Sequence, residues 1–184
     1  MQVIKFIEMQ HGTQEEYDFL DRRHKEWKGE HFVKGVLDML KATGEPDGGY
    51  QINRFQHGLQ RATLALRDGQ DEEMVVAALL HDIGDLLAPD NHSDLAAAVL
   101  QPYVSERVHW IVKHHGIFQG YYFWHFEMYR GHPWFEDCAS FCAKYDQIAF
   151  DPNYDTLPLE AFEPMVHRIL GRAPFAFEKP QAAE

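Results

Sequence analysis

The sequence lacks any apolar run close to the ~18 residues that a membrane span requires, and its first ten residues do not resemble an export signal. It has only two cysteines, Cys138 and Cys142, which is too few for a disulfide framework and favours a reducing compartment. It also lacks an excess of basic residues, since the formal net charge is -12. These absences predict a cytoplasmic protein that binds neither membrane nor nucleic acid.

Alternating strand patterns are missing too, whereas apolar residues recur at helical spacing between glycine and proline breaks. We therefore predict an all-α fold, a single helical bundle over 1–184. Its core would cover about 44–170, with N-terminal helices in 1–43 packing on it and a tail at 174–184. The expected helices cover 13–28, the segment around 33–40 that stops at Gly44, 55–69, 71–82, the segment from Pro89 to 100, 105–116, a long helix from Pro133 through Asp146, and 159–170.

Several helix starts carry their own signals. Thr13 and Glu16 have the spacing of a capping box, and Asp71 and Ser105 are typical N-cap residues. Gly44 and Gly116 are expected to end the helices that precede them.

The strongest chemical signal is the pair His81-Asp82, which follows the apolar segment 75–80. A histidine and an aspartate are costly to bury unless they are paired or bind a metal. A carboxylate has two oxygens, so Asp82 is the natural bridge between two ions. Taken alone, this dipeptide is more simply explained as a chance or capping pair.

Other polar residues lie on or beside apolar helix faces in the same way: His57, His92, His115 and Asp146. For any one of them, a satisfied core residue is the simpler interpretation. Their recurrence on successive helices instead indicates one shared metal site. His114 is the alternative to His115, but His115 shares its helix face with Val108 and Ile111.

The order His57, His81-Asp82, His92, His115, Asp146 resembles the HD superfamily, and more narrowly its di-iron oxygenases. These include myo-inositol oxygenase and the dioxygenases that cleave 1-hydroxy-2-aminoethylphosphonate or its N-trimethyl relative. The matching stretches lie at 56–60, 77–84, 92–100, 105–108 and 144–146. The resemblance implies two iron ions as cofactors. His57, His81 and Asp146 would hold one ion, His92 and His115 the other, and Asp82 would bridge them.

Two positions depart from the family pattern. Asp85 stands where relatives carry a basic residue or histidine, which puts inherited phosphonate binding in doubt. Upstream of His57, relatives have a tyrosine and a glutamate as a lid, and here only Tyr50 follows Gly48-Gly49. Tyr50 is expected either to cap one iron, as a catalytic residue beside Asp82, or to be an ordinary aromatic anchor.

An aromatic run follows the last histidine ligand: Phe118, Tyr121, Tyr122, Phe123, Trp124, Phe126, Tyr129 and Trp134. Such density is more often plain core packing. The alternative is a cage for a quaternary ammonium, which ring faces can hold. For the substrate site we predict Asp85, Gln119, Tyr121, Tyr122, Trp124, Arg130 and Lys144.

The resemblance thus implies an O2-dependent enzyme that cleaves the C–P bond of a small 1-hydroxyphosphonate. The expected substrate is (1-hydroxy-2-(trimethylammonio)ethyl)phosphonate, converted to glycine betaine and phosphate. One alternative is a metal-dependent HD phosphohydrolase, and another is an oxygenase of 1-hydroxy-2-aminoethylphosphonate or a polyol. An inactive metal-binding sensor is a third.

Overall fold

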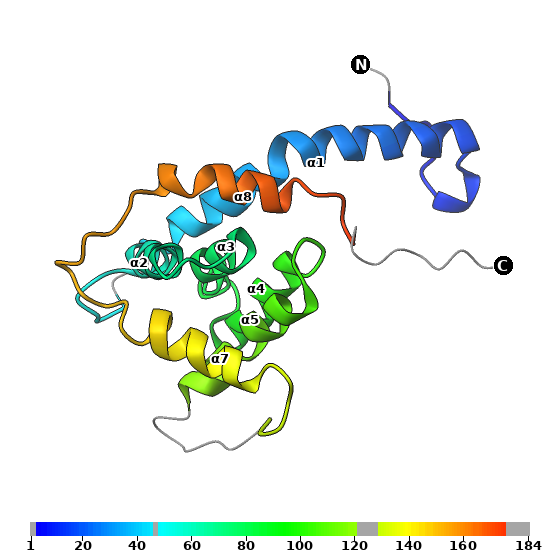
Figure 1. Ribbon diagram of the computed structural model, residues 1–184. Helices are drawn as coiled ribbons and strands as arrows, with labels where there is room; N and C mark the ends of the chain where they lie inside the picture. The colour runs from blue at the N-terminus through cyan, green and yellow to red at the C-terminus, as the bar shows by residue number, and fades with distance from the viewer. Residues whose placement is uncertain (1–2, 46–47, 121–128, 176–184) are drawn as a thin grey trace.

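The computed structural model describes residues 3–45, 48–120 and 129–175, which form helices and connecting turns without a strand (Figure 1). The predicted all-α bundle is therefore confirmed. The α-helices are α1 (Gln14–Ala42), α2 (Arg54–Arg67), α3 (Glu72–Leu80), α4 (His92–Leu100), α5 (Glu106–Gln119), α7 (Phe135–Phe141) and α8 (Glu163–Leu170). Short turns of helix are η1 (Met9–His11), η2 (Pro89–Asn91), η3 (Cys142–Asp146) and η4 (Leu159–Ala161).

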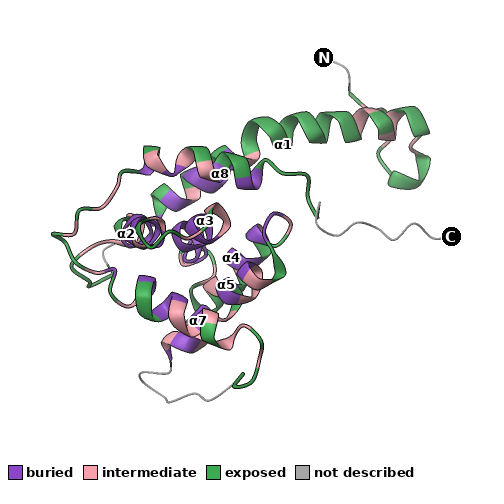
Figure 2. Ribbon diagram, viewed as in Figure 1, coloured by how far each residue is buried: buried purple, intermediate pink, exposed green. Residues whose placement is uncertain are grey.

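Helix α3 forms the centre of the bundle, and every residue of it from Met74 to Leu80 is buried. It packs against α2, α5 and α8 (Figures 1 and 2). Helix α2 lies especially close to it at Gly58, where an added Cβ would come within 2.8 Å of the Leu79 carbonyl oxygen. The apolar α3 sequence is thus explained by burial on all sides, and it carries His81 into the interior at its end.

The predicted caps are present. The side chains of Thr13, Asp71 and Ser105 accept hydrogen bonds at the starts of α1, α3 and α5. Sequence reasoning missed Asn53, which forms a capping box with Gln56 and fixes where α2 begins.

Three predicted boundaries were wrong. The segments 13–28 and 33–40 belong to one helix, α1, because neither a proline nor a capping residue separates them. Helix α5 continues through Gly116, where an added Cβ would lie 3.0 Å from the Ser93 hydroxyl of α4, so this glycine serves close packing rather than a stop. The long helix predicted from Pro133 begins at Phe135 and widens into a π-turn at Cys142–Asp146.

The two halves of α1 have different surroundings. Its buried residues, Val33, Val36, Leu37 and Leu40, all lie in the C-terminal half, which packs on the bundle. The N-terminal half projects from the bundle, as Figure 2 shows by its exposed surface. The predicted packing of the N-terminal region on the core thus applies to the second half of this helix.

No helix among the described residues combines the length and the apolar character needed to cross a membrane. Cys138 and Cys142 are buried free thiols, as expected from their number and spacing.

Candidate metal centre

The bundle brings six predicted residues into one cluster. His57 comes from α2, and His81 and Asp82 come from the turn after α3. The other three lie at the start of α4, on the buried face of α5 and at the end of η3; they are His92, His115 and Asp146. Chain segments that are separate in sequence therefore present their polar side chains to one point inside the molecule.

Asp82 lies between two pairs of histidines. Its Oδ2 is 2.7 Å from Nε2 of His81 and 3.8 Å from Nε2 of His57. Its Oδ1 is 3.2 Å from Nε2 of His115 and 3.5 Å from Nε2 of His92. Two groups of possible metal ligands share Asp82, and the ligand atoms within each group lie within 4.8 Å of one another. One group is His57, His81 and Asp82, and the other is Asp82, His92 and His115. Each carboxylate oxygen thus faces its own imidazole pair.

The four imidazoles are oriented by their other ring nitrogen. Each Nδ1 lies against a backbone carbonyl, which can only accept a hydrogen bond, so Nδ1 carries the proton. The contacts are His57 to Ala149 at 2.8 Å, His81 to Ala78 at 3.0 Å, His92 to Pro89 at 3.3 Å and His115 to Val112 at 2.6 Å. In the neutral rings every Nε2 is therefore a lone-pair acceptor facing the cluster.

This donor set fits divalent metal ions. Nε2 of His81 and of His92 is buried without a hydrogen-bond partner among the described residues. Burial, and then the nearby Arg61 charge, lower the pKa of His81 from 6.5 to about 3, which keeps its ring neutral. Nε2 of His81 and Oδ2 of Asp82 are then both acceptors, so their 2.7 Å approach calls for a cation that both can bind.

Asp82 is ionised in this environment. Burial alone would raise the pKa of Asp82, but His81 and His115 lower it well below its usual range. At neutral pH both oxygens of the Asp82 carboxylate are therefore unprotonated and available to metal ions.

Asp146 has a partner that sequence reasoning missed. Arg61, one turn after His57 on α2, is fully buried, and its Nη1 lies 2.9 Å from Oδ1 of Asp146. The guanidinium also stacks on the Phe141 ring, 4.5 Å from its centroid. Burial would raise the pKa of Asp146, but Arg61 and then His57 lower it far below its usual range. An arginine inside an otherwise apolar helix face was the available signal.

The remaining contacts of Asp146 complete its position. Its Oδ1 is 3.1 Å from Nε2 of His57, and its Oδ2 accepts a hydrogen bond from the Gln119 amide. Gln119, predicted as a substrate contact, thus lies against a member of the cluster. The π-turn, closed by the amide of Gln147 donating to the carbonyl of Cys142, sets the end of η3 that presents Asp146.

Asp85 and Arg54 lie at the outer side of the cluster. Asp85 is 3.2 Å from Nδ1 of His92, as a carboxylate that orients a ligating histidine would be. Nε of Arg54 is 3.0 Å from Asp85, and its Nη1 is 3.5 Å from Asp82. Burial and repulsion from Asp82 raise the pKa of Asp85, while Arg54 opposes the shift. Asp85, predicted to bind substrate, is thus already paired with cluster groups.

Gly84 makes this turn possible, because an added Cβ there would lie 2.5 Å from the carbonyl oxygen of His92. The turn that carries Asp82 and Asp85 can approach the start of α4 only with a glycine at this position.

Tyr50 lies outside the layer that contacts the cluster. The Phe150 ring stacks on His57 with centroids 4.3 Å apart, and Tyr50 stacks on the far side of Phe150 at 4.8 Å. The Arg54 guanidinium lies over the Tyr50 ring, 5.5 Å from its centroid. The structure therefore favours the aromatic-anchor interpretation of Tyr50, and direct ligation of a metal stays a prediction.

The remaining predicted site residues divide into three cases. Lys144 points away from the cluster, since it is exposed and its ammonium lies 3.3 Å from Asp68 at the end of α2. Its proximity in sequence to Asp146 was misleading, because at about 100° per residue two helix residues that are two positions apart point to nearly opposite sides. Arg130 lies in the turn before α7, and Tyr121, Tyr122 and Trp124 lie outside the described residues.

His114, the alternative to His115, stacks on Trp110 instead, with centroids 4.3 Å apart.

The family model of the HD domain matches residues 54–149, which is just over half of the chain and includes all six cluster residues. The chain therefore belongs to the HD domain family, whose members bind divalent metals.

A more particular similarity is to a [1-hydroxy-2-(trimethylamino)ethyl]phosphonate dioxygenase (glycine-betaine-forming) from Leisingera caerulea. The two sequences are 43% identical over 56 residues, which cover 29% of this chain and 26% of that protein. The similarity thus spans about a quarter of the relative's length.

Proposed function

We propose that this chain is an O2-dependent oxygenase with two iron ions. Its proposed substrate is (1-hydroxy-2-(trimethylammonio)ethyl)phosphonate, and its products are glycine betaine and phosphate. The ligands would be the six clustered residues, with His57, His81 and Asp146 at one ion, His92 and His115 at the other, and Asp82 between them. The similarity to the Leisingera protein and the reducing environment that two free thiols favour support this activity in the cytoplasm.

The observation that carries the proposal is the division of the Asp82 oxygens. Oδ2 faces His81 and His57, whereas Oδ1 faces His115 and His92. A single-metal site would need one carboxylate oxygen and one group of histidines. Two separate groups that share a carboxylate are the arrangement a pair of ions requires.

The groups around the cluster suggest how substrate is held. His92 is the most exposed of the four cluster histidines, with 23% of its side chain accessible, so substrate would approach from this side. Arg54 lies at the same side and is 35% exposed. Its guanidinium offers hydrogen bonds to an anionic oxygen once Asp82 is engaged by metal. Arg54 is thus a better candidate than Lys144 for the phosphonate contact.

When bound, the two iron ions supply the redox chemistry by which O2 oxidises the hydroxyl-bearing carbon. The reaction balances without another reductant, since one O2 and one 1-hydroxyphosphonate give one carboxylate and one phosphate. The chain orients the imidazoles through their backbone contacts. Phe150 and the buried end of α3 exclude water from the His57 side.

The test uses protein loaded with Fe(II) under anaerobic conditions, mixed with the trimethylated substrate and then exposed to O2. We expect about two irons per chain, and phosphate and glycine betaine formed in equal amounts only after O2 is added. Asp82→Asn should abolish both products, whereas Asp90→Asn, an exposed change in η2, should not.

Two outcomes would replace the proposal. Anaerobic release of phosphate from a phosphoester, supported by manganese or cobalt, would identify an HD phosphohydrolase. Oxygen-dependent turnover of 1-hydroxy-2-aminoethylphosphonate or a polyol, but not of the trimethylated compound, would keep the oxygenase and change its substrate.

A further inference from the structure

The N-terminal half of α1 forms an arm together with the segment that precedes it. Residues 14–31 of the helix contribute no buried side chain. At 1.5 Å per residue they extend for about 27 Å. Figure 1 shows this part of α1 leading away from the other helices. Most helical stability in proteins comes from tertiary packing, which this part of α1 lacks, so such an arm calls for a partner.

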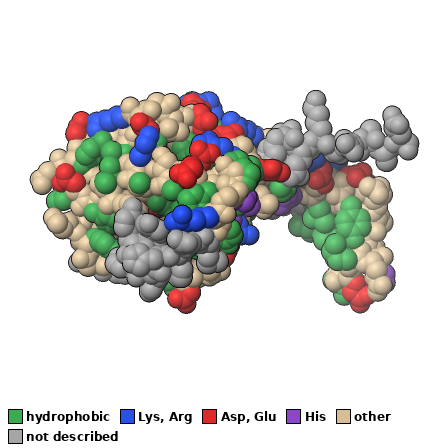
Figure 3. Space-filling view, turned by 60° about the horizontal axis from the view of Figure 1, so that its bottom comes forward, with side chains coloured by type: hydrophobic (Ala, Val, Ile, Leu, Met, Phe, Trp, Pro, Cys, Tyr) green, Lys and Arg blue, Asp and Glu red, His purple; other side chains and the backbone are tan. Residues whose placement is uncertain are grey.

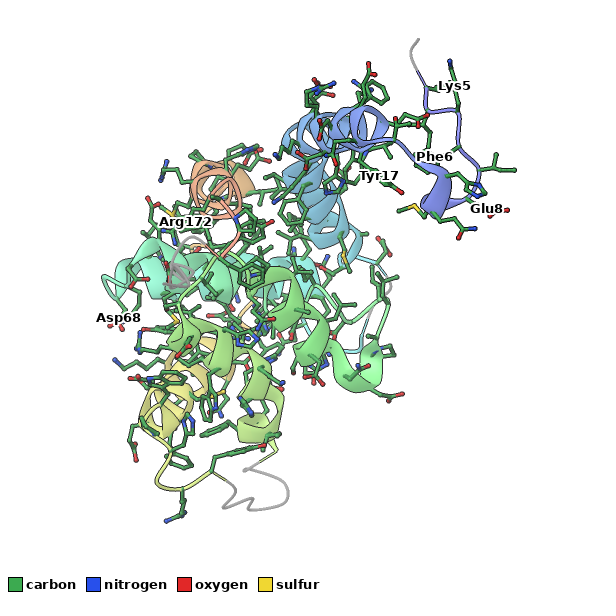
Figure 4. The ribbon with its side chains drawn as sticks, turned by 90° about the vertical axis from the view of Figure 1, so that its right-hand side faces the viewer. Lys5, Phe6, Glu8, Tyr17, Asp68 and Arg172 are labelled. Atoms are coloured by element: carbon green, nitrogen blue, oxygen red, sulfur yellow. The ribbon has the colours of Figure 1, made fainter. Side chains whose placement is uncertain are left out.

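The free end of the arm is held together by contacts with α1 and exposes apolar side chains. Residues 3–13 fold back on α1: the Lys5 amide donates to Glu16 at 2.8 Å, and the Phe6 and Tyr17 rings lie 5.5 Å apart (Figure 4). Between them lies a hollow of about 660 Å³, and the exposed apolar residues beside it include Val3 and Ile7. Figure 3 shows hydrophobic side chains gathered on this arm, away from the main body.

One face of the arm carries a stripe at seven-residue spacing: Tyr17, Leu20, His24, Trp27 and His31. Ring contacts confirm that its central members share a face, since Trp27 lies 6.2 Å from His24 and 5.8 Å from His31, measured between centroids. Trp27 is 56% exposed. At 100° per residue this stripe lies opposite the face that packs on the bundle. It corresponds to the contact positions of a two-stranded coiled coil.

The flanking charges select one orientation of a second arm. In a parallel pair, Glu16 of one copy would meet Asp21 of the other, and Arg23 would meet Lys28, so like charges would face each other. A parallel pair is therefore disfavoured.

The charges also select one antiparallel register. When Leu20 faces His31 and His24 faces Trp27, the flanking residues meet with opposite charge. These pairs are Asp21 with Lys28 and Arg23 with Glu30, and the twofold axis makes each of them twice.

Neighbouring antiparallel registers are worse. A shift by seven residues would place Asp21 against Asp21 and Arg23 against Arg23. A further shift would leave only Tyr17 and Leu20 of the stripe in contact.

We infer that the arm is a homodimer interface, in which α1 of a second copy of this chain packs antiparallel on the stripe around Trp27. The flanking charges of α1 match each other in a single antiparallel register, which is the reason for choosing a second copy over another partner. The inference is independent of the metal centre and of the proposed reaction.

The test is the mass of the full-length protein in solution, measured by light scattering and by native mass spectrometry. Wild type is expected as a dimer of the 21.4 kDa chain. Arg23→Glu and Glu30→Arg should each raise the dimer dissociation constant by about tenfold or more, because each creates two repulsive contacts. Trp27→Asp should abolish the dimer.

Two rescues make the register testable. The double variant Arg23→Glu/Glu30→Arg should dimerise like wild type. The two single variants should form a heterodimer when mixed, because every flanking pair is then oppositely charged. Arg22→Glu is the matched control, since it makes the same charge change at an exposed position on the outer side of α1.

A wild-type monomer at ~100 µM would overturn the inference, and so would a failure of both rescues while circular dichroism shows intact helix. Equal dissociation by Arg22→Glu and Arg23→Glu would also overturn it, because a general loss of charge balance would then explain the result.

Discussion

The two halves of the cluster differ in how the chain surrounds them. In the inner half, His57, His81, Arg61 and Asp146 have side chains that are at most 1% exposed. In the outer half His115 is equally buried, but His92 is 23% exposed, and its neighbours Asp85 and Arg54 are 17% and 35% exposed. The inner half is therefore fixed by packing, and the outer half can exchange ligands with solvent.

Charge follows the same division. The inner carboxylate Asp146 is balanced by a guanidinium that no solvent reaches, so removing either partner leaves an isolated buried charge. The outer carboxylate Asp85 is balanced by Arg54, which is about one-third exposed and which water can replace. Changes in the inner half should thus affect folding, and changes in the outer half should affect ligand exchange.

The largest effect is expected where the halves join. Asp82→Ala should remove both metal ions, because each of its oxygens faces a different half. His57→Ala and His92→Ala should each keep more metal per chain than Asp82→Ala, because each removes a ligand of only one ion. Elemental analysis after loading with Fe(II) checks this order. An Asp82→Ala protein that keeps a full complement of metal would contradict the bridging role.

The next effect tests the inner half. Arg61→Met should lower the free energy of unfolding by about 3–5 kcal/mol, because it leaves Asp146 buried without its cation. Arg67→Met on the same helix is the control, since its pair with Asp155 is exposed and should matter by less than about 1 kcal/mol. Urea unfolding of the metal-free proteins measures both. Equal stability of the two variants would remove the proposed distinction between the halves.

Acid should also act first on the inner half. Burial keeps His81 neutral with a pKa of about 3, against 6.5 for an exposed ring, so the unfolded chain binds a proton that the folded chain does not. Stability of the metal-free protein should therefore fall as pH drops below about 6.5, by up to about 1.4 kcal/mol per pH unit from this group. The loss should end near pH 3.

Thermal or urea unfolding at several pH values measures this slope. His81→Gln should flatten it, whereas His24→Gln, on the exposed arm, should leave it unchanged. A slope that is the same in all three proteins would show that His81 is not the group responsible.

A smaller effect is expected in the outer half. Asp85→Asn should keep the fold but weaken metal binding by about 10–100-fold, because His92 loses the carboxylate that orients it. Competition with a chelator measures the affinity. Loss of both ions, or no change for either, would count against a role confined to the outer half.

The smallest effect concerns the substrate's cation. If Tyr121, Tyr122 and Trp124 form a cage, replacing one of them by Leu should weaken binding of the trimethylated phosphonate by about tenfold. Binding of the phosphonate with a primary amine should weaken less. Binding titrations with both compounds test this. Equal losses would show that these rings only pack, and the metal site would be unaffected.

The sequence by itself determined the helices and the candidate ligands. Capping residues such as Asp71 and Ser105 mark helix starts through local hydrogen bonds, and the apolar segment of α3 predicts burial. Burial in turn makes His81 and Asp82 stand out, because polar groups there need a partner. These signals depend on near neighbours along the chain, which is why they could be read without coordinates.

Only the tertiary structure decided how these residues meet. The contact of Arg61 with Asp146, the Phe150 layer between Tyr50 and His57, and the position of Lys144 away from the cluster join or separate segments far apart along the chain. The direction of each Asp82 oxygen follows from how α2, α4 and α5 pack around α3. The direction of these side chains depends on how each helix is rotated about its axis and on the extra residue that the π-turn inserts before Asp146. Local sequence signals do not specify either of these.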